Sequence, residues 1–416
     1  MEKGGYPLIF DWAPPISRQL MIGERLFKKM TSKERMLTAF RNQQPDMVPV
    51  SPDISNMIPA KLTGKPFWDI YLYGDPPLWK AYIEAVKHYK IDGWRGGPLG
   101  PLIDSTKALR PLNRSDKRRF RKVIVNKTDE AIILRTYCIT PKGKLWSETV
   151  FYRDQPPWTT RKYFKDFEKE FDHLQYFYPD PSGLSGEAYW IIAKAMGDLG
   201  ITGLSVRLPG FQDLFGLIDG GLEEICRLYM QKSGLIEEYR KMCHEYIVSY
   251  VERGLEIHPE FLLIGASGLL TLQSPRIFRE LSLPTLKKIT RMAKEAGVPS
   301  HLHSCGRERY IVEVAAKETD LSSIEPLEPP PGGDCDLAEI KRLYGKRIAL
   351  KGNIQTTRFL MATPKEVEQM AKWCIDVAGE GGGFVLSTGD QVGRDTPEEN
   401  LFKLVEFARK YGKYRN

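Results

Sequence analysis

The sequence predicts an α/β fold, a (β/α)8 TIM barrel with an N-terminal extension and a β-hairpin insert. Short apolar segments alternate with amphipathic segments of helical length, which is the pattern of a parallel sheet with crossover helices. About eight such units in roughly 350 residues suit a barrel with insertions. No strand leads into a dinucleotide-type Gly-x-Gly-x-x-Gly turn, so a Rossmann fold is the second interpretation.

The composition is that of an ordinary globular enzyme. The chain has 416 residues, of which 42% are hydrophobic and 27% are charged, and its formal net charge of +8 is mild for this length. It lacks nucleic-acid-binding motifs, a secretion signal and any apolar run of the roughly 20 residues that would span a bilayer. We therefore expect a cytoplasmic protein that binds neither nucleic acid nor membrane. Six dispersed cysteines predict a reducing compartment, not a disulfide framework: Cys138, Cys226, Cys243, Cys305, Cys335 and Cys374.

The predicted domains are an N-terminal arm over residues 1–30 and a single barrel over residues 31–416. The arm carries aromatic residues and prolines, and we expect it to act as a lid or as a subunit contact, which leaves a homodimer open. The first helix of the barrel begins at Thr31 or Ser32, either of which can cap it. The first strand is expected at residues 48–52.

An antiparallel excursion interrupts the strand–helix alternation at about residues 118–160. Three segments there alternate apolar and polar residues, and a Pro-Lys-Gly turn joins the last two. We interpret this region as a β-hairpin insert. The strands expected after it lie at 200–206, 261–265, 298–303, 321–325, 348–353 and 383–387, each followed or preceded by a helix.

Polar side chains at the ends of consecutive strands predict a metal site. His303 and Cys305 are two residues apart on a predicted strand, so they share one face, and imidazole and thiolate are zinc ligands. A buried histidine beside a free cysteine is the simpler alternative. Asp390, after the last strand, is the preferred third ligand, and Cys335 and Glu325 are its rivals. Glu325 and Asn353, at two further strand ends, are the candidate catalytic residues.

Aromatic residues mark a second candidate region. Phe67, Trp68 and Tyr71 are close in sequence and, with Trp94, either pack between helices or form the wall of a site for a flat ring. We take these four as candidate substrate-binding residues. A basic cluster over residues 114–122 is either a solvated loop or a contact for an acidic partner.

Motifs in a fixed order carry a resemblance to the uroporphyrinogen decarboxylase superfamily over about residues 31–412. Within it, the His-x-Cys-Gly element resembles the zinc- and cobalamin-dependent methyltransferase branch. The resemblance implies a (β/α)8 barrel. The motifs are Lys33-Glu34-Arg35, Pro45-Asp46-Met47-Val48-Pro49-Val50, Thr140-Pro141-Lys142-Gly143, His303-Ser304-Cys305-Gly306, Gly352-Asn353-Ile354 and Thr396-Pro397-Glu398-Glu399-Asn400.

This sequence differs from two branches of the superfamily, and the differences disfavour their activities. True decarboxylases carry an arginine-rich segment after the first strand that holds the carboxylates of the porphyrinogen, and residues 51–57 contain no arginine. Enzymes that methylate coenzyme M have a cysteine as third ligand near the last strand, where this chain has Asp390. A carboxylate is a harder ligand, which disfavours thiol activation.

The segment Gly64–Tyr71 resembles the first methyltransferases of aryl-methyl-ether O-demethylase systems. That resemblance implies Zn2+ and methyl transfer from a methoxylated aromatic compound to Co(I) of a corrinoid (cobalamin) on a separate corrinoid protein. The alternatives are a methylcobalamin:thiol methyltransferase, a uroporphyrinogen decarboxylase-like decarboxylase and a non-catalytic binding protein on the same fold.

Overall fold

The computed structural model describes residues 29–101, 112–115 and 118–414. Most of the predicted arm, residues 1–28, lies outside the described residues. Within them, no helix combines the length and the apolar character needed to cross a bilayer.

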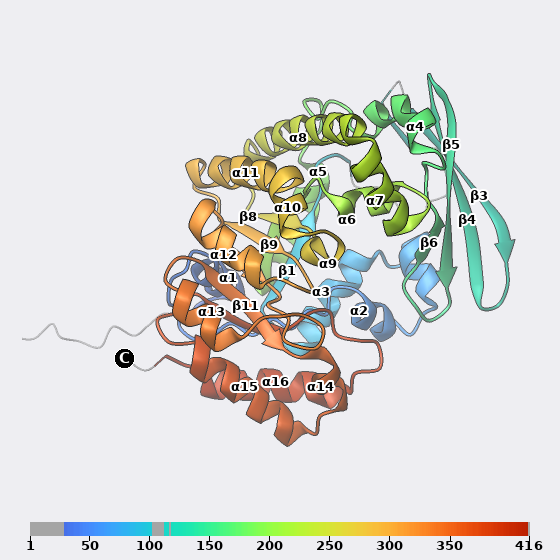
Figure 1. Ribbon diagram of the computed structural model, residues 1–416. Helices are drawn as coiled ribbons and strands as arrows, with labels where there is room; N and C mark the ends of the chain where they lie inside the picture. Colours follow the sequence, from blue (N-terminus) through green and yellow to red (C-terminus); the bar gives the residue numbers. More distant parts are fainter. Residues whose placement is uncertain (1–28, 102–111, 116–117, 415–416) are drawn as a thin grey trace, which may run out of the picture.

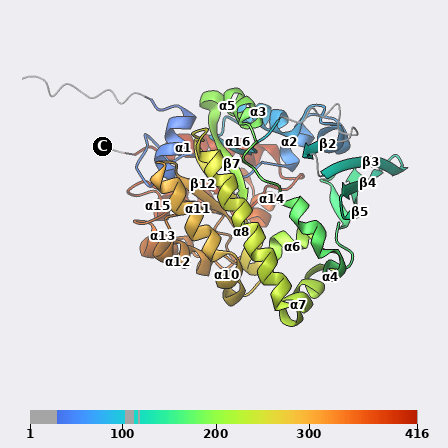
Figure 2. The ribbon, with the colours of Figure 1, turned by 90° about the horizontal axis from the view of Figure 1, so that it is seen from above.

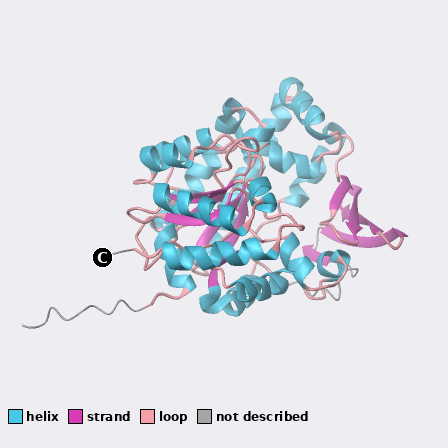
Figure 3. Ribbon diagram, turned by 90° about the horizontal axis from the view of Figure 1, so that it is seen from below, coloured by secondary structure: helices cyan, strands magenta, loops and turns pink. Residues whose placement is uncertain are grey.

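A seven-stranded parallel sheet forms the centre of the molecule, with strands in the order β1-β7-β8-β9-β10-β11-β12. Every neighbouring pair is parallel. Helices surround this sheet, as Figure 3 shows. The strands β10, β11 and β12 are buried along their whole length, which is expected where both faces of a parallel sheet are covered. Their bounds are β1 Gly93–Gly97, β7 Gly200–Arg207, β8 Phe261–Gly265, β9 Ser300–His303, β10 Ser323–Glu325, β11 Ala349–Ile354 and β12 Phe384–Thr388.

Residues 49–51, in the first predicted strand, lie between the two edges of this sheet. Ser51 N–H donates to Leu386 O at 2.8 Å, and Leu386 N–H donates to Pro49 O at 2.9 Å. On the other side, the N–H of Asp92, which precedes β1, donates to Val50 O at 2.9 Å. The predicted α/β fold with a curled parallel sheet is confirmed. The closed eight-stranded barrel stays a prediction that these bonds support.

The first helix begins as its sequence predicts. Thr31 and Glu34 form a reciprocal capping box at the start of α1. The other helices of the N-terminal half are α2 Met57–Leu62, η1 Asp69–Tyr73, α3 Leu78–Tyr89, α4 Phe167–Glu170, η3 Phe171–Phe177, α5 Glu187–Met196 and η4 Gly197–Leu199, after α1 Ser32–Phe40.

The helices of the C-terminal half cover the sheet between successive strands. Several short helices, such as α6, α9 and α14, come directly after strands and were not predicted. The bounds are α6 Phe211–Leu217, α7 Gly221–Gln231, α8 Ser233–Leu255, α9 Leu269–Leu272, α10 Pro275–Leu281, α11 Leu283–Glu295, α12 Arg309–Glu318, α13 Leu337–Tyr344, α14 Thr356–Met361, α15 Pro364–Ala378 and α16 Glu398–Tyr411.

A buried ion network ties the first helix to the sheet. The Arg35 guanidinium bonds Asp46 at 2.7 Å and Asp92 at 2.8 Å, and Asp92 also accepts the N–H of Val50 at 2.8 Å. Arg409 of the last helix lies 2.8 Å from the same Asp92 carboxylate. The two ends of the barrel segment therefore meet at one carboxylate.

A five-stranded antiparallel sheet stands at the side of the molecule (Figures 1 and 2). It occupies the region of the predicted insert but is larger than a hairpin. Its strands are β2 Leu112–Ser115, β3 Arg118–Lys127, β4 Ala131–Thr140, β5 Gly143–Tyr152 and β6 Trp158–Arg161. Ile132, Leu134 and Phe151 pack against Leu72, with Trp68 beside them, so the sheet is attached to the η1 segment by an apolar contact.

Candidate metal centre

His303 and Cys305 lie where β9 ends. His303 is the last residue of the strand, and Cys305 follows after one residue, before the chain turns at Gly306. Gly306 has a φ of +86°, and a Cβ at this position would lie 2.1 Å from Thr271 Oγ1. Only glycine fits this backbone without displacing its neighbour. The turn that follows the two candidate ligands therefore requires the glycine at position 306.

Asp390 completes a cluster with these two residues. It lies two residues after the end of β12, and one ligand atom from each of His303, Cys305 and Asp390 lies within 4.8 Å of the others. Zinc bonds of 2.0 to 2.3 Å at tetrahedral angles would place such atoms about 3.5 Å apart, so a small side-chain adjustment would suffice. All three residues are half-buried. The donor set, its spacing and its exposure fit a zinc ion.

Glu325 lies behind His303 instead of in the cluster. Its carboxylate is buried, and Oε1 lies 3.0 Å from His303 Nδ1. Such a contact fixes the ring so that Nε2 is free for a metal. Burial opposes the charge on Glu325, but the Lys351 ammonium and the neighbouring imidazoles outweigh it and hold its pKa well below the usual range. Lys351 bonds Glu325 and lies 3.1 Å from Ser387 Oγ.

A pocket of about 550 Å³ contains the three candidate ligands. Its lining comes from the ends of β1, β7, β8 and β9 and from the loops after residue 51 and after β12. Active sites of α/β barrels lie at this end of the strands. Besides the cluster, the polar lining comprises Asp53, Ser55, Arg95, Ser205, Ser267 and Gln391.

Of the four aromatic candidates, the structure brings only Trp94 to this pocket. Phe67 is buried in a separate cluster near α2, and Trp68 packs toward the antiparallel sheet. Tyr71 contacts both clusters, and its hydroxyl bonds Asn56. Phe67, Trp68 and Tyr71 are absent from the lining of this pocket, although Tyr71 interacts with Arg95, which belongs to it. Their role in substrate binding stays a prediction.

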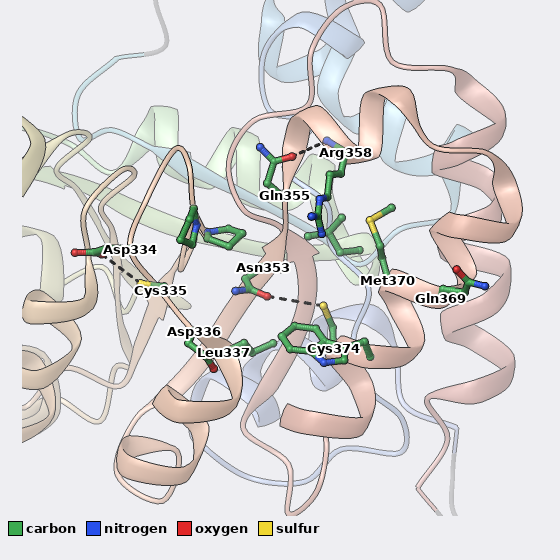
Figure 4. Close-up of a pocket in the computed structure, with 14 residues that line it drawn as sticks. Asp334, Cys335, Asp336, Leu337, Asn353, Gln355, Arg358, Gln369, Met370 and Cys374 are labelled. Atoms are coloured by element: carbon green, nitrogen blue, oxygen red, sulfur yellow. Dashed lines mark hydrogen bonds between the residues drawn. The ribbon is translucent and has the colours of Figure 1, made fainter.

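Asn353 and Cys335 line a different pocket, which Figure 4 shows. Asn353 Nδ2 donates to Leu327 O at 3.1 Å, and its Oδ1 lies 3.9 Å from Cys374 Sγ. Burial is the main cause that raises the pKa of Cys335 far above its usual value. The structure therefore separates Asn353 and Cys335 from the candidate metal cluster.

Sequence reasoning missed three charged residues near the cluster: Asp53, Arg95 and Lys351. Lys351 is a lone cation in an apolar strand, and it is almost completely buried. A buried lysine needs an acidic partner, so this pattern could have indicated Glu325 as its neighbour. Asp53 directly follows the first predicted strand, which is where barrel enzymes place functional groups.

Comparison with known proteins finds similarity to one family. Residues 214–411 match the family model described as Uroporphyrinogen decarboxylase (URO-D). A uroporphyrinogen decarboxylase of Aromatoleum aromaticum is 22% identical over 207 residues, which cover 47% of this chain and 55% of that protein. One of Erwinia tasmaniensis is 29% identical over 135 residues, covering 32% and 36% respectively. These alignments span about half or less of each relative.

The fold is similar to that of a solved methyltransferase. The structure of a methyltransferase from Methanosarcina mazei superposes with a TM-score of 0.60 and 18% sequence identity. The superposition covers 92% of this chain and 99% of that one. The chain is thus similar in sequence, over its C-terminal half, to uroporphyrinogen decarboxylases and similar in fold, over most of its length, to a methyltransferase.

Proposed function

We propose that the protein is a zinc-dependent methyltransferase that moves a methyl group from a methoxylated aromatic compound to Co(I) of a corrinoid protein. The observation that carries the proposal is the convergence of His303, Cys305 and Asp390, with Glu325 bonded behind the histidine. The closed (β/α)8 barrel over residues 31–416 belongs to the same proposal and is supported by the hydrogen bonds of residues 49–51.

The three candidate ligands would hold zinc through an imidazole nitrogen, a thiolate and a carboxylate oxygen. Three protein ligands leave one position of a tetrahedral ion for a substrate. The ion would supply Lewis acidity toward the ether oxygen, which leaves as a phenolate. Glu325 keeps His303 in the tautomer that binds metal, and the paired Lys351 keeps Glu325 ionised.

The residues of the pocket would mainly position the substrate. Because the nucleophile is the cobalt of the partner, the chain needs no covalent nucleophile of its own. Trp94 and the backbone at Gly96 and Gly265 form the walls near the strand ends. Holding the methyl carbon at the mouth of such a pocket converts an encounter of two molecules into an oriented reaction.

The basic insert supports an acidic protein partner. Residues 118–165 contain twelve Lys or Arg and four Asp or Glu, an excess equal to the net charge of the chain. The insert also reaches the loop that carries Asp390, because Arg394 lies 2.7 Å from Asp154. A positive surface beside the pocket would steer an acidic corrinoid protein toward it.

The test is a methyl-transfer assay with reduced cobalamin and a set of methoxybenzenes. The proposal expects methylcobalamin and the corresponding phenol in equal amounts, with activity that requires zinc. A chain that methylates thiols from methylcobalamin and leaves every methoxybenzene intact would contradict the proposal.

A uroporphyrinogen decarboxylase-like reaction is the second candidate, and the family match favours it. It predicts release of CO2 from a porphyrinogen without any requirement for zinc. Because the two reactions share neither substrate nor product, the same preparation of protein distinguishes them.

A further inference from the structure

The pocket of the candidate metal centre contains an arginine, Arg95, that pairs with no carboxylate among the described residues. Arg95 lies on β1, is half-buried and lines the pocket. Its Nε is buried without a hydrogen-bond partner, and no carboxylate of the described residues lies within 4.0 Å of its guanidinium. The Tyr82 ring centroid is 5.5 Å from its Cζ. Arg95 thus lies over an aromatic face but bonds no anion.

Arg35 is an example of an arginine in this chain that stabilises the fold through ion pairs. Its guanidinium bonds two carboxylates, those of Asp46 and Asp92, and a backbone carbonyl. Buried charges are usually paired in this way, because an unpaired charge keeps its desolvation penalty. Arg95 departs from the rule at the edge of a pocket, where a ligand can supply the missing acceptor.

The carboxylate of Asp53 interacts with Arg95 but forms no ion pair with it. Asp53 lines the same pocket and interacts with Arg95 through its charge only. Its Oδ1 accepts the N–H of Ser55 at 2.9 Å. Burial is the main influence on Arg95 and lowers its pKa, while Tyr82, Tyr71 and Asp53 act in the opposite direction. Arg95 therefore lines the pocket with a guanidinium whose Nε has no hydrogen-bond partner among the described residues.

There is room in the pocket for a ligand beside this cation. The backbone of Gly265 borders the pocket, and a Cβ built there would have no heavy atom nearer than Val206 O at 3.8 Å. The hydroxyls of Ser205 and Ser267 belong to the same lining. The guanidinium has the planar shape and paired N–H groups that bind an oxyanion through two hydrogen bonds.

We infer that Arg95 forms an anion subsite and that the substrate carries a carboxylate group on its methoxylated ring. This inference rests on the proposed function, because it assumes that the substrate occupies the pocket beside His303, Cys305 and Asp390. A sulfonate-bearing thiol would satisfy the same guanidinium, so the shared chemistry is a planar or tetrahedral oxyanion. The experiment separates these two sources.

The experiment compares matched charged and neutral ligands by calorimetric titration of the zinc-loaded protein. The pairs are 4-methoxybenzoate with 4-methoxybenzamide and 2-mercaptoethanesulfonate with 2-mercaptoethanol. The proteins are the wild type, Arg95→Met, Arg95→Lys and the control Arg207→Met. Arg207 ends the neighbouring strand β7 but pairs with Asp213 at 3.0 Å and does not line the pocket. Zinc content and melting temperature are measured on each protein.

The wild type should bind 4-methoxybenzoate about tenfold or more tightly than 4-methoxybenzamide, as expected for a charge-assisted hydrogen-bonded pair. Arg95→Met should lose this preference with its zinc intact, Arg95→Lys should retain part of it, and Arg207→Met should retain all of it. A preference for the sulfonate alone would keep the anion subsite and overturn the methoxybenzoate assignment.

Two outcomes overturn the subsite: equal binding of charged and neutral ligands by the wild type, or an unchanged preference in Arg95→Met. If Arg95→Met does not fold, the subsite is tested by comparing how the wild type and Arg95→Lys bind the charged and neutral ligand of each pair. If the preference depends on Arg95 but no methyl group is transferred to cobalamin, the anion subsite stands and the proposed function is wrong. If methyl transfer occurs at equal rates from 4-methoxybenzoate and 4-methoxybenzamide, the proposed function stands and the anion subsite is wrong.

Discussion

Two pockets of nearly equal size lie near the same ends of the strands, but they contain different chemistry. The pocket of His303, Cys305 and Asp390 has a volume of about 550 Å³, and the pocket in Figure 4 has one of about 570 Å³. The second pocket also contains cysteines, Cys335 and Cys374, yet the described residues around it include no histidine.

The neighbours of a cysteine decide whether it can bind a metal. Burial raises the pKa of Cys374 to about 12, and Cys335, also buried, lies next to Glu308 and Asp334, which raise its pKa further. A thiolate is costly in such places, and the thiolate is the form that binds metal. Cys305 is half-buried and adjoins an imidazole and a carboxylate. Cysteine substitutions in the second pocket therefore serve as controls for substitutions of the candidate ligands in the first.

The largest expected effect is on methyl transfer. His303→Ala should reduce the rate of transfer to cobalamin at least about a hundredfold, because it removes a metal ligand and with it the Lewis acid. Cys335→Ser and Cys374→Ser should remain within about threefold of the wild type, since neither thiol meets the cluster. Activity in His303→Ala comparable to the wild type would contradict the claim that the first pocket holds the catalytic metal.

Glu325→Gln should weaken zinc binding about tenfold to a hundredfold, because the carboxylate orients His303. It should also destabilise the fold, since Lys351 would be left as a buried cation without its counter-charge. Chelator competition measures the first effect and urea unfolding the second. The control is Asn353→Ala, in the second pocket, for which we expect no change in zinc affinity.

The pH dependence of thiol labelling tests the ionisation of a cysteine in the second pocket. With a pKa of about 12, only about one Cys374 thiol in ten thousand is ionised at pH 8, and the fraction rises tenfold per pH unit. Iodoacetamide labelling of native protein at Cys374 should therefore be slow at pH 8 and increase up to pH 10 without a plateau. The exposed Cys226 is the reference. A plateau for Cys374 near pH 9 would contradict this account of the second pocket.

The smallest effect is expected outside both pockets. Trp68→Leu should lower the melting temperature, because Trp68 packs where η1 meets the antiparallel sheet. The KM for a methoxybenzene should change less than about twofold, whereas Trp94→Leu should raise it several-fold. Steady-state kinetics and thermal unfolding test both variants. A larger KM change for Trp68→Leu than for Trp94→Leu would contradict this account and support Trp68 as part of the substrate site.

The sequence predicted the parts of the fold that depend on local patterns. The strand ending in His303 and the capping box of α1 follow from alternation and capping chemistry. The cluster of His303, Cys305 and Asp390 followed because parallel strands end at one edge of a sheet. These predictions need no knowledge of tertiary packing.

The residues that sequence reasoning missed depend on tertiary contacts. Arg95 resembles any solvated cation in a glycine-rich segment, and only the fold shows that it lines a pocket without forming an ion pair with an acid of the described residues. Phe67 and Trp68 have the composition of a ring-binding wall, but Phe67 packs with residues of α2 and η1, and Trp68 packs against the insert. Asn353 ends a strand as a site residue would, yet its side chain lies toward α15 and Cys374. Pattern alone does not assign such side chains to one pocket or another.

The most direct test of the central claim is the zinc content of purified protein by elemental analysis. The measurement compares the wild type with His303→Ala, Asp390→Ala and Cys335→Ser. We predict about one zinc per chain in the wild type and in Cys335→Ser, and a loss of zinc in the other two variants. A wild-type protein without zinc after loading, or zinc retained in His303→Ala, would contradict the assignment of the metal centre.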